Sequence, residues 1–362
     1  MAETTKDNFS DAIKEIDADS IKCPGCGSNM AFDPASQMLL CPHCDTKKSF
    51  ASSVAKELDL SDGVLSGREW PADEAVVFRC DNCGAKVVLD STETAKSCPF
   101  CGTAHVRRVE EFAGIKPSAV VPFTLTCDNA VSVTRQWAKR KLFAPKKFKK
   151  NLKAEDLKGI YAPCFTFDSK TESYYKGVIG ETRTRVVGSG KNRRVETYTV
   201  WRNISGIYHD SFDDVTIAAG TKLDQKQLNK ISPFDTNRSK SYEKNYMLGF
   251  MAYRYDRELE DCWQAAKKDI DRAITHGILS NYVYDKVSYL NVSTTHSDVT
   301  YKHVMLPVYV GNFRYNKKSY NFFVNGSSGK VYGKTPKSVW KILCAVAIGV
   351  ATVVGVALLS LI

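Results

Sequence analysis

Eight cysteines in the N-terminal third of this 362-residue chain form four Cys-x-x-Cys pairs at a repeated spacing. Fourteen residues separate the two pairs of each set, and the second set follows the first by 57 residues, so the region is an internal repeat. Two such turns aim four thiolates at one ion and complete a tetrahedral site with Zn–S bonds of about 2.3 Å. The sequence therefore predicts two structural Zn²⁺ ions, each held in a zinc ribbon, with the ligands Cys23, Cys26, Cys41, Cys44, Cys80, Cys83, Cys98 and Cys101.

The residue after the second cysteine of each pair shapes the turn that carries the ligands. A positive φ at this position lets backbone N–H groups point at sulfur, and glycine adopts that conformation most easily. Three of the four positions hold glycine, namely Gly27, Gly84 and Gly102. The fourth holds Asp45, which tolerates a positive φ less readily but does adopt it.

Other chemistries of paired cysteines fit this pattern less well. A thioredoxin-type redox pair would lie beside a βαβ pattern, which is absent, and a catalytic zinc would leave one ligand position open. In a reducing cytosol the pattern indicates a metal site rather than disulfides, with iron as an alternative ion. His43 and His105 lie beside the ligands and could replace one, although two complete sets of thiolates favour cysteine.

Charge divides the chain into an acidic head and a basic body. Residues 1–110 carry 12 Lys and Arg against 18 Asp and Glu, a net charge of −6, whereas residues 111–362 carry 39 against 22, a net charge of +17. Nucleic acid needs clustered Lys and Arg, and a zinc ion held by four thiolates is itself formally anionic. The negative charge of residues 1–110 therefore favours a protein rather than a nucleic acid as the partner of the ribbons.

The C-terminal stretch Ile342–Ile362 contains 21 residues without a charge. As a helix it reaches about 31 Å, the thickness of a bilayer's hydrocarbon core. It predicts a transmembrane tail anchor, inserted after synthesis, with everything before Trp340 on one side; a hydrophobic core helix is the alternative. Small residues four apart, such as Ala345 and Gly349, could pack two tails together in a homo-oligomer.

Flanking charge predicts the orientation of this anchor. From Val299 to the end there is no Asp or Glu, while eight residues are Lys or Arg. Basic flanks stay on the cytoplasmic face of a membrane, and Met1–Asp19 lacks the apolar core of a signal peptide. We therefore expect a single-pass protein of the plasma membrane with its soluble domains in the cytoplasm.

The segment from Arg135 to Lys153 is the strongest basic run. Phe143 and Phe148 interrupt it and could dock at a lipid headgroup surface or stack on bases. A solvated helix face is the commonest origin of such a run, and anionic lipid or nucleic acid are the functional alternatives. The nine basic residues are Arg135, Lys139, Arg140, Lys141, Lys146, Lys147, Lys149, Lys150 and Lys153.

Hydrophobic periodicity predicts an α+β body, with a mixed antiparallel sheet and covering helices. We expect helices near 128–142, 223–231 and 256–279, and strands at 160–167, 173–179, 182–187, 194–208, 215–218, 283–293, 299–312, 318–325 and 330–332. Tyr161, Phe165, Phe167, Trp201 and Phe250 are expected in the core. The predicted organisation is a short helix at 1–19, zinc ribbon 1 at 20–50, a linker at 51–74, zinc ribbon 2 at 75–109, a linker at 110–125, the α+β domain at 126–336 and the tail anchor at 340–362.

The sequence offers no catalytic constellation. The glycine-rich stretch Gly188–Asn192 reads as a hairpin turn rather than a phosphate loop, because the residues required around its lysine are missing. Asp168, Asp213 and Asp214 could hold a metal, although isolated acids at strand ends are usually only solvated. We therefore expect a protein that is not an enzyme.

Several blocks outside the ribbons resemble a bacterial family. They are Gly159–Asp168 (GIYAPCFTFD), Tyr246–Phe250 (YMLGF) and Phe323–Val331 (FVNGSSGKV), the last being the most specific. With the ribbons, they are similar to the membrane-anchored, TFIIB-type zinc-ribbon proteins of the YdjG type, often labelled primosomal or phage-replication-like. The resemblance implies an adaptor that brings PspA-type or SPFH-like proteins to the inner face of the membrane under envelope stress. The alternative is a membrane-tethered nucleic-acid-binding protein that uses residues 135–153.

Overall fold

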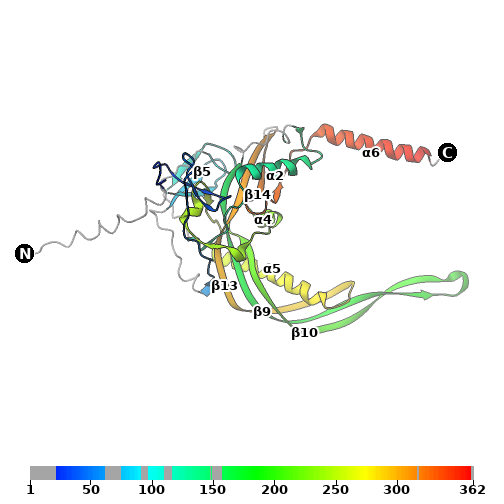
Figure 1. The fold of residues 1–362 in the computed structure, drawn as a ribbon. Coiled ribbons are helices and arrows are strands. Elements are labelled where there is room, and N and C mark those ends of the chain that lie inside the picture. The colour runs from blue at the N-terminus through cyan, green and yellow to red at the C-terminus, as the bar shows by residue number, and fades with distance from the viewer. Residues whose placement is uncertain are drawn as a thin grey trace, which may run out of the picture.

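The computed structural model describes residues 22–61, 75–90, 97–109, 116–146, 148, 157–315 and 318–359. Within them the chain is an α+β protein with one large mixed sheet and one small sheet (Figure 1). The predicted helix at 1–19 lies outside the described residues. The small sheet has the order β1-β2-β3, formed by β1 (Ala31–Asp33), β2 (Met38–Leu40) and β3 (Lys47–Lys48).

The large sheet is built on three very long strands. Twelve strands take part, and the main path runs β11-β8-β13-β9-β12-β6-β5-β7, with β10, β14, β15 and β4 attached beside it. These strands are β4 (Leu58–Asp59), β5 (Ala75–Cys80), β6 (Lys86–Asp90), β7 (Val106–Val109), β8 (Ala119–Val120), β9 (Leu157–Val187), β10 (Arg194–Ala218), β11 (Lys240–Ser241), β12 (Met251–Tyr253), β13 (Lys286–Tyr315), β14 (Lys318–Asn325) and β15 (Val331–Gly333). Strand β9 pairs antiparallel with both β10 and β13, whereas β12 runs parallel to β9, so the sheet is mixed rather than purely antiparallel.

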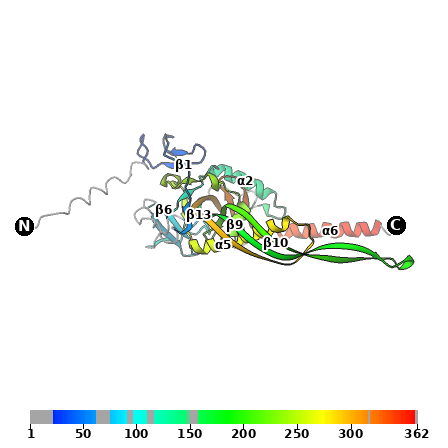
Figure 2. The ribbon, with the colours of Figure 1, turned by 90° about the horizontal axis from the view of Figure 1, so that it is seen from below.

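The far ends of β9 and β10 form a long arm that leaves the body of the molecule (Figures 1 and 2). Their pairing continues to Val187 opposite Arg194, and the short 3-10 helix η3 (Gly190–Asn192) closes the tip. The predicted hairpin turn is confirmed, and Gly188 has a φ of 89° there. A side chain at Gly188 would meet the carbonyl oxygen of Asn192, so this turn requires glycine.

Four helices accompany the sheet in the described part of the chain, namely α2 (Cys127–Lys139), α4 (Gln225–Ile231), α5 (Leu259–Ser280) and α6 (Val339–Leu359). Short 3-10 helices lie at η4 (Thr236–Arg238) and η5 (Lys244–Met247). Helix α5 packs its apolar stripe, including Trp263, Ile270 and Ile274, on the base of the arm. Thr126 caps α2 by accepting from the N–H of Asn129, and Asp224 and Gln227 form a capping box on α4, which explains where both helices begin.

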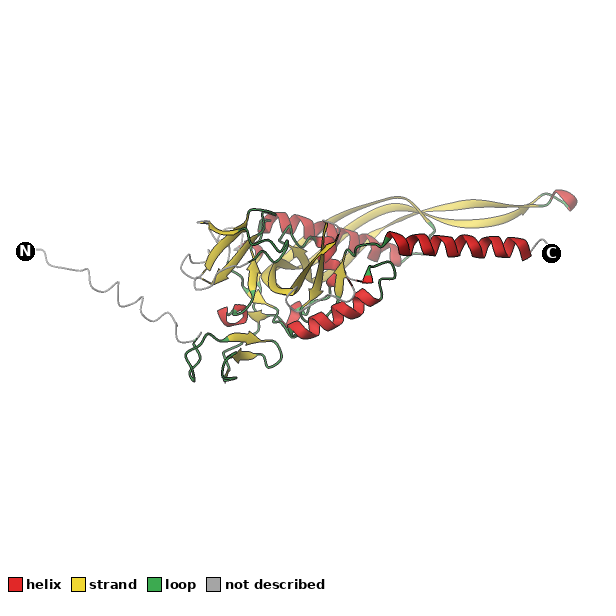
Figure 3. Ribbon diagram, turned by 90° about the horizontal axis from the view of Figure 1, so that it is seen from above, coloured by secondary structure: helices red, strands yellow, loops and turns green. Residues whose placement is uncertain are grey.

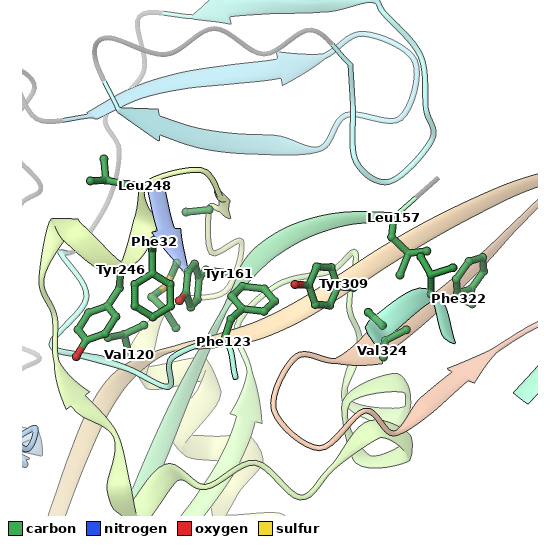
Figure 4. Packing of buried hydrophobic residues seen from close by; sticks show 14 of the residues in the cluster. Phe32, Val120, Phe123, Leu157, Tyr161, Tyr246, Leu248, Tyr309, Phe322 and Val324 are labelled. Carbon is green, nitrogen blue, oxygen red and sulfur yellow. The ribbon is translucent and has the colours of Figure 1, made fainter. Parts of the chain in front are cut away.

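An aromatic core joins the small sheet to the large one. Phe123 stacks on Phe250 with ring centroids 4.2 Å apart, and Tyr161 meets Phe123 edge-on at 5.0 Å. Phe32 of the small sheet reaches the same cluster through Phe250, at 6.5 Å between ring centroids, and packs edge-on against Tyr246 on its other side (Figure 4). The expected core positions of Tyr161, Phe165 and Phe167 are confirmed. Trp201 is an exception, because it lies on the arm and is 49% exposed.

The strands are far longer than the sequence predicted. The three segments expected between 160 and 187 form one strand, β9, and the two expected between 283 and 312 form β13. Asp168 and Gly180 break the apolar alternation of β9, but the neighbouring strands absorb the irregularities. Register shifts occur opposite β9 between Phe212 and Val215 and between Ser297 and Thr300, so β9 itself continues.

Helix α6 projects from the body on the side of the arm (Figures 1 and 3). No helix in the described ranges combines the length and the apolarity that crossing a membrane requires. The last residues of the predicted span, 360–362, lie outside the described residues.

Candidate metal centres

The first four-cysteine cluster lies where two turns face each other beside β1 and β2. Cys23, Cys26, Cys41 and Cys44 converge so that their sulfur atoms all lie within 4.8 Å of one another. The closest pairs are Cys23–Cys44 at 3.4 Å and Cys26–Cys41 at 3.5 Å. Cys23 and Cys41 are buried, whereas Cys26 and Cys44 are exposed.

The second cluster repeats the geometry of the first. Cys80, Cys83, Cys98 and Cys101 lie within the same 4.8 Å limit, with sulfur separations of 3.6 Å for Cys80–Cys101 and for Cys83–Cys98. Here the second cysteine of each pair, Cys83 or Cys101, is half-buried, whereas Cys26 and Cys44 of the first cluster are exposed. Both clusters therefore bring together the residues that the sequence predicted.

All four ligand turns have the predicted backbone conformation. The φ angles are 71° at Gly27, 56° at Asp45, 71° at Gly84 and 69° at Gly102. In each turn the N–H of this residue donates to the carbonyl of the first cysteine, at 2.8 to 3.1 Å. The N–H of Gly25 donates to Cys23 Sγ at 3.3 Å, which is the N–H···S contact expected of such a turn.

The sulfur geometry fits a tetrahedral ion in each cluster. Four sulfurs at about 2.3 Å from one centre are about 3.8 Å apart, close to the separations of 3.4 to 3.6 Å found here. Disulfides would require about 2.05 Å. Four thiolates close the coordination shell, so an ion held here would stabilise the fold and would not activate a substrate.

The first cluster is attached to the body mainly by side-chain packing. Phe32 lies 5.3 Å from Tyr246 and 6.2 Å from Phe50, measured between ring centroids. The N–H of Phe32 donates to the carbonyl of Leu248 at 3.0 Å, and Gln37 Nε2 donates to the carbonyl of Phe123 at 2.7 Å. The three strands of this ribbon pair only with one another.

The second cluster is part of the large sheet. Strand β6, which follows the first pair of ligands, pairs with β12, and β12 pairs with β9 at the centre of the molecule. Phe100 lies between two ligands in the sequence, and its ring centroid is 5.1 Å from that of Tyr253. Asn312 Nδ2 donates to the backbone carbonyl of Phe100 at 3.1 Å. Burial raises the pKa of the Cys98 thiol, which shows that the body encloses this cysteine.

The predicted basic segment is only partly brought together. Arg135 and Lys139 lie on α2, and Arg140, Lys141 and Lys146 follow it; all five are exposed. Lys147, Lys149, Lys150 and Lys153 lie outside the described residues. Phe148 is fully buried against Phe313, so it cannot dock on a surface, whereas Phe143 is 41% exposed.

A charge cluster at the base of the arm joins Asp168 and Asp214, two of the acids considered above as metal ligands, to Glu57 and Lys302, which were not predicted. Lys302 Nζ lies 2.9 Å from Asp214 Oδ1 and 3.2 Å from Glu57 Oε1, and the side chains of Lys302 and Asp214 are only 6% and 5% exposed. The N–H of Asp214 donates to Asp168 Oδ1 at 2.7 Å, and Thr300 Oγ1 donates to Glu57 at 2.7 Å. Long-range pairing of β4, β9, β10 and β13 brings these residues together, so the sequence marked Asp168 and Asp214 as acids at strand ends but did not predict their partners.

This cluster has the protonation pattern of a carboxyl pair that shares a proton. Burial and the neighbouring Glu57 raise the pKa of Asp168 to about 7. The hydrogen bond from Asp168 lowers the pKa of Glu57 to about 2. Glu57, Asp168 and Asp213 each offer an oxygen within 4.8 Å of the others. Lys302 supplies one positive charge beside Glu57 and Asp214.

These features define an α+β protein with two four-cysteine clusters suited to zinc and placed at the N-terminal end. Along most of its length the chain is a distant homologue of the Bacillus subtilis (strain 168) "Uncharacterized protein YdjG". The two are 28% identical over 326 residues, which cover 89% of this chain and 92% of that protein. No family model matches the chain, and no solved structure matches it.

Proposed function

We propose that this protein is a non-enzymatic adaptor that α6 holds at a membrane and whose two zinc ribbons engage a cytosolic protein. The observation that carries the proposal is the exposed apolar surface of α6. Seven of its large apolar side chains are more than half exposed, and they are Trp340, Leu343, Val346, Ile348, Val350, Val353 and Val354. Water-exposed apolar surface of this extent is typical of a contact with lipid or protein.

The start of α6 has the composition of a membrane interface. Lys341 Nζ donates to the carbonyls of Leu142 at 3.2 Å and Ala144 at 2.7 Å, so the loop after α2 is joined to the first turn of α6. Around this junction Leu142 and Trp340 are 76% and 78% exposed. Exposed tryptophan beside lysine is the usual composition at the level of lipid headgroups.

The predicted basic segment begins at the same junction, which supports anionic lipid as its ligand. Lys139, Arg140 and Lys141 lie next to the loop that Lys341 contacts. Each basic residue close to an anionic surface contributes about 1 kcal/mol. The membrane in question is the plasma membrane, with the ribbons on its cytoplasmic side.

The exposed ligand turns of the first ribbon favour it as the surface for a protein partner. Its ion would be closed to catalysis, and residues 1–110 carry a net negative charge that disfavours nucleic acid. A PspA-type or SPFH-like protein is the partner that the resemblance implies. A function in envelope stress belongs to the same proposal.

Alkaline extraction of membranes tests the proposal. The full chain should stay in the membrane pellet, and the double substitution Val346→Lys with Val350→Lys should release it, because each buried lysine costs about 3 kcal/mol in a bilayer. Val195→Lys is the matched control, because Val195 is equally exposed but lies on the arm. Release of the unaltered chain by alkali would contradict the proposal, and so would release of the control alone.

A further inference from the structure

The outer edge of β10 is the longest unpaired strand edge in the described part of the molecule. The strand runs for 25 residues, and β9 is the only described strand that pairs with it. Folded proteins protect such edges with charged side chains, with proline, with bulges or with a covering element. Between Arg194 and Phe212 the edge contains no proline, and its register is unbroken.

The same stretch of β10 also exposes apolar side chains. Val195, Tyr198, Val200, Trp201 and Ile207 are between 37% and 67% exposed. Side chains alternate between the two faces of a strand, so these residues place apolar surface on both faces of the arm. A strand with an open edge and apolar faces is suited to accept another strand.

We propose that a second copy of this chain covers this edge, with the two β10 strands paired antiparallel about a two-fold axis at Thr199. In such a dimer opposed residues must lie on the same face, so the axis passes through a residue rather than between two residues. A centre at Thr199 opposes Glu196 of one copy to Arg202 of the other, twice. Tyr198 then faces Val200, and Thr197 faces Trp201.

Charge favours this register over three nearby ones. A centre at Tyr198 would oppose Arg194 to Arg202 twice, and a centre at Arg202 would place that residue opposite itself. Like charges in direct opposition destabilise paired strands. A centre at Glu196 fails for the same reason.

The ends of the arm are complementary in the same arrangement. The tip carries Arg193 and Arg194, and in the dimer it lies beside residues 204–210 of the second copy. There Asp210 and the neighbouring Glu172 provide negative charge. The two-fold arrangement therefore brings the basic tip of each copy to the acidic base of the other arm.

Existing contacts leave both partners of the proposed pair able to form it. Arg202 donates one Nη to the carbonyl of Val283 at 2.8 Å, and a guanidinium has five N–H donors. Glu196 already accepts from Arg185 and Arg194 at 3.1 and 3.0 Å on the same arm. Its two carboxylate oxygens offer about four acceptor sites, so a further donor can be accommodated.

Sedimentation of the full chain in mild detergent tests the dimer through a charge exchange. Glu196→Arg and Arg202→Glu should each raise the dimer dissociation constant about tenfold, because each creates two like-charged pairs. The double variant should restore dimerisation, which a general loss of arm structure would not do. A monomer at every soluble concentration of the unaltered chain would overturn the proposal, as would a double variant no better than the single ones.

Cysteine crosslinking tests the register. Thr199→Cys should form a disulfide-linked dimer on mild oxidation, because residues on the two-fold axis face each other at about 5 Å between Cβ atoms. Tyr174→Cys is the control, since Tyr174 is 53% exposed on β9 and lies away from the edge. Equal crosslinking at both positions would overturn the Thr199 register. The dimer is argued from β10 and does not depend on how α6 meets a membrane, so alkaline extraction and crosslinking can fail separately.

Discussion

The two four-cysteine clusters share one local geometry but differ in how they belong to the molecule. The first ribbon forms a separate three-stranded sheet with two exposed ligands. The second contributes β5, β6 and β7 to the twelve-stranded sheet, and its ligands are buried or half-buried. The same spacing of cysteines thus gives one ribbon that is attached to the large sheet by packing and one that is part of that sheet. A local motif therefore predicts the metal site but not how much the site contributes to the stability of the whole fold.

The largest expected difference follows from removing one ligand in each cluster. Cys98→Ser should lose one ion and lower the free energy of unfolding of the body by several kcal/mol, because β6 links the second cluster to β12 and β9. Cys41→Ser should also lose one ion yet leave the main transition nearly unchanged. Thermal unfolding followed by circular dichroism measures both, and equal losses in the two variants would break the comparison.

Separating the first ribbon from the body without disturbing its ion should have the next largest effect. Phe32 is 4% exposed within the aromatic cluster, so Phe32→Ala should cost about 3 to 4 kcal/mol of docking while both ions stay bound. Hydrogen exchange of β1 and β2 reports the undocking. Phe143→Ala removes an equally large but half-exposed ring, and exchange in the small sheet should not respond to it.

The charge cluster of Glu57, Asp168 and Lys302 should make stability depend on pH. Asp168 has its pKa raised to about 7. Its contribution to the free energy of unfolding is therefore fully present below its ordinary pKa near 4 and is lost as pH rises from there through 7. Glu57 has its pKa lowered to about 2. Its contribution to the free energy of unfolding is fully present above its ordinary pKa near 4.5, and this contribution is lost as pH falls towards 2.

The charge cluster is therefore most stabilising at about pH 4, between the ordinary pKa values of the two carboxyls. Asp168→Asn should flatten the fall in stability between about pH 4 and 7, by at most about 2 kcal/mol, since this carboxyl is only half-buried. Denaturant titrations across that range provide the test. An unchanged pH slope in the variant would show that Asp168 does not carry the proton.

Chelation kinetics should show the smallest difference. The exposed Cys26 and Cys44 let a chelator reach the first ion, whereas Cys83 and Cys101 are partly covered. We expect the ion of the first cluster to leave about tenfold faster than the ion of the second. This ratio corresponds to a difference of about 1.4 kcal/mol in the activation free energy of release. Release of two ions in one phase would mean that packing around the ligands does not control access.

Local patterns predicted a good part of this fold. The ligand turns follow from cysteine spacing and from glycine or Asp45, and α5 follows from its apolar stripe. The continuity of β9 could not be read locally, because the irregularities opposite Asp168 are absorbed by its partner strands. The pairing of Lys302 with Asp214 depends on contacts across 88 positions in the chain, for which hydrophobic periodicity contains no information.

Native mass spectrometry of the full chain and of its two single-cluster variants measures the central claim most directly. The account predicts two zinc ions per chain in the unaltered protein and one in each of Cys41→Ser and Cys98→Ser. One ion or none in the unaltered protein would contradict it, as would loss of both ions from either variant.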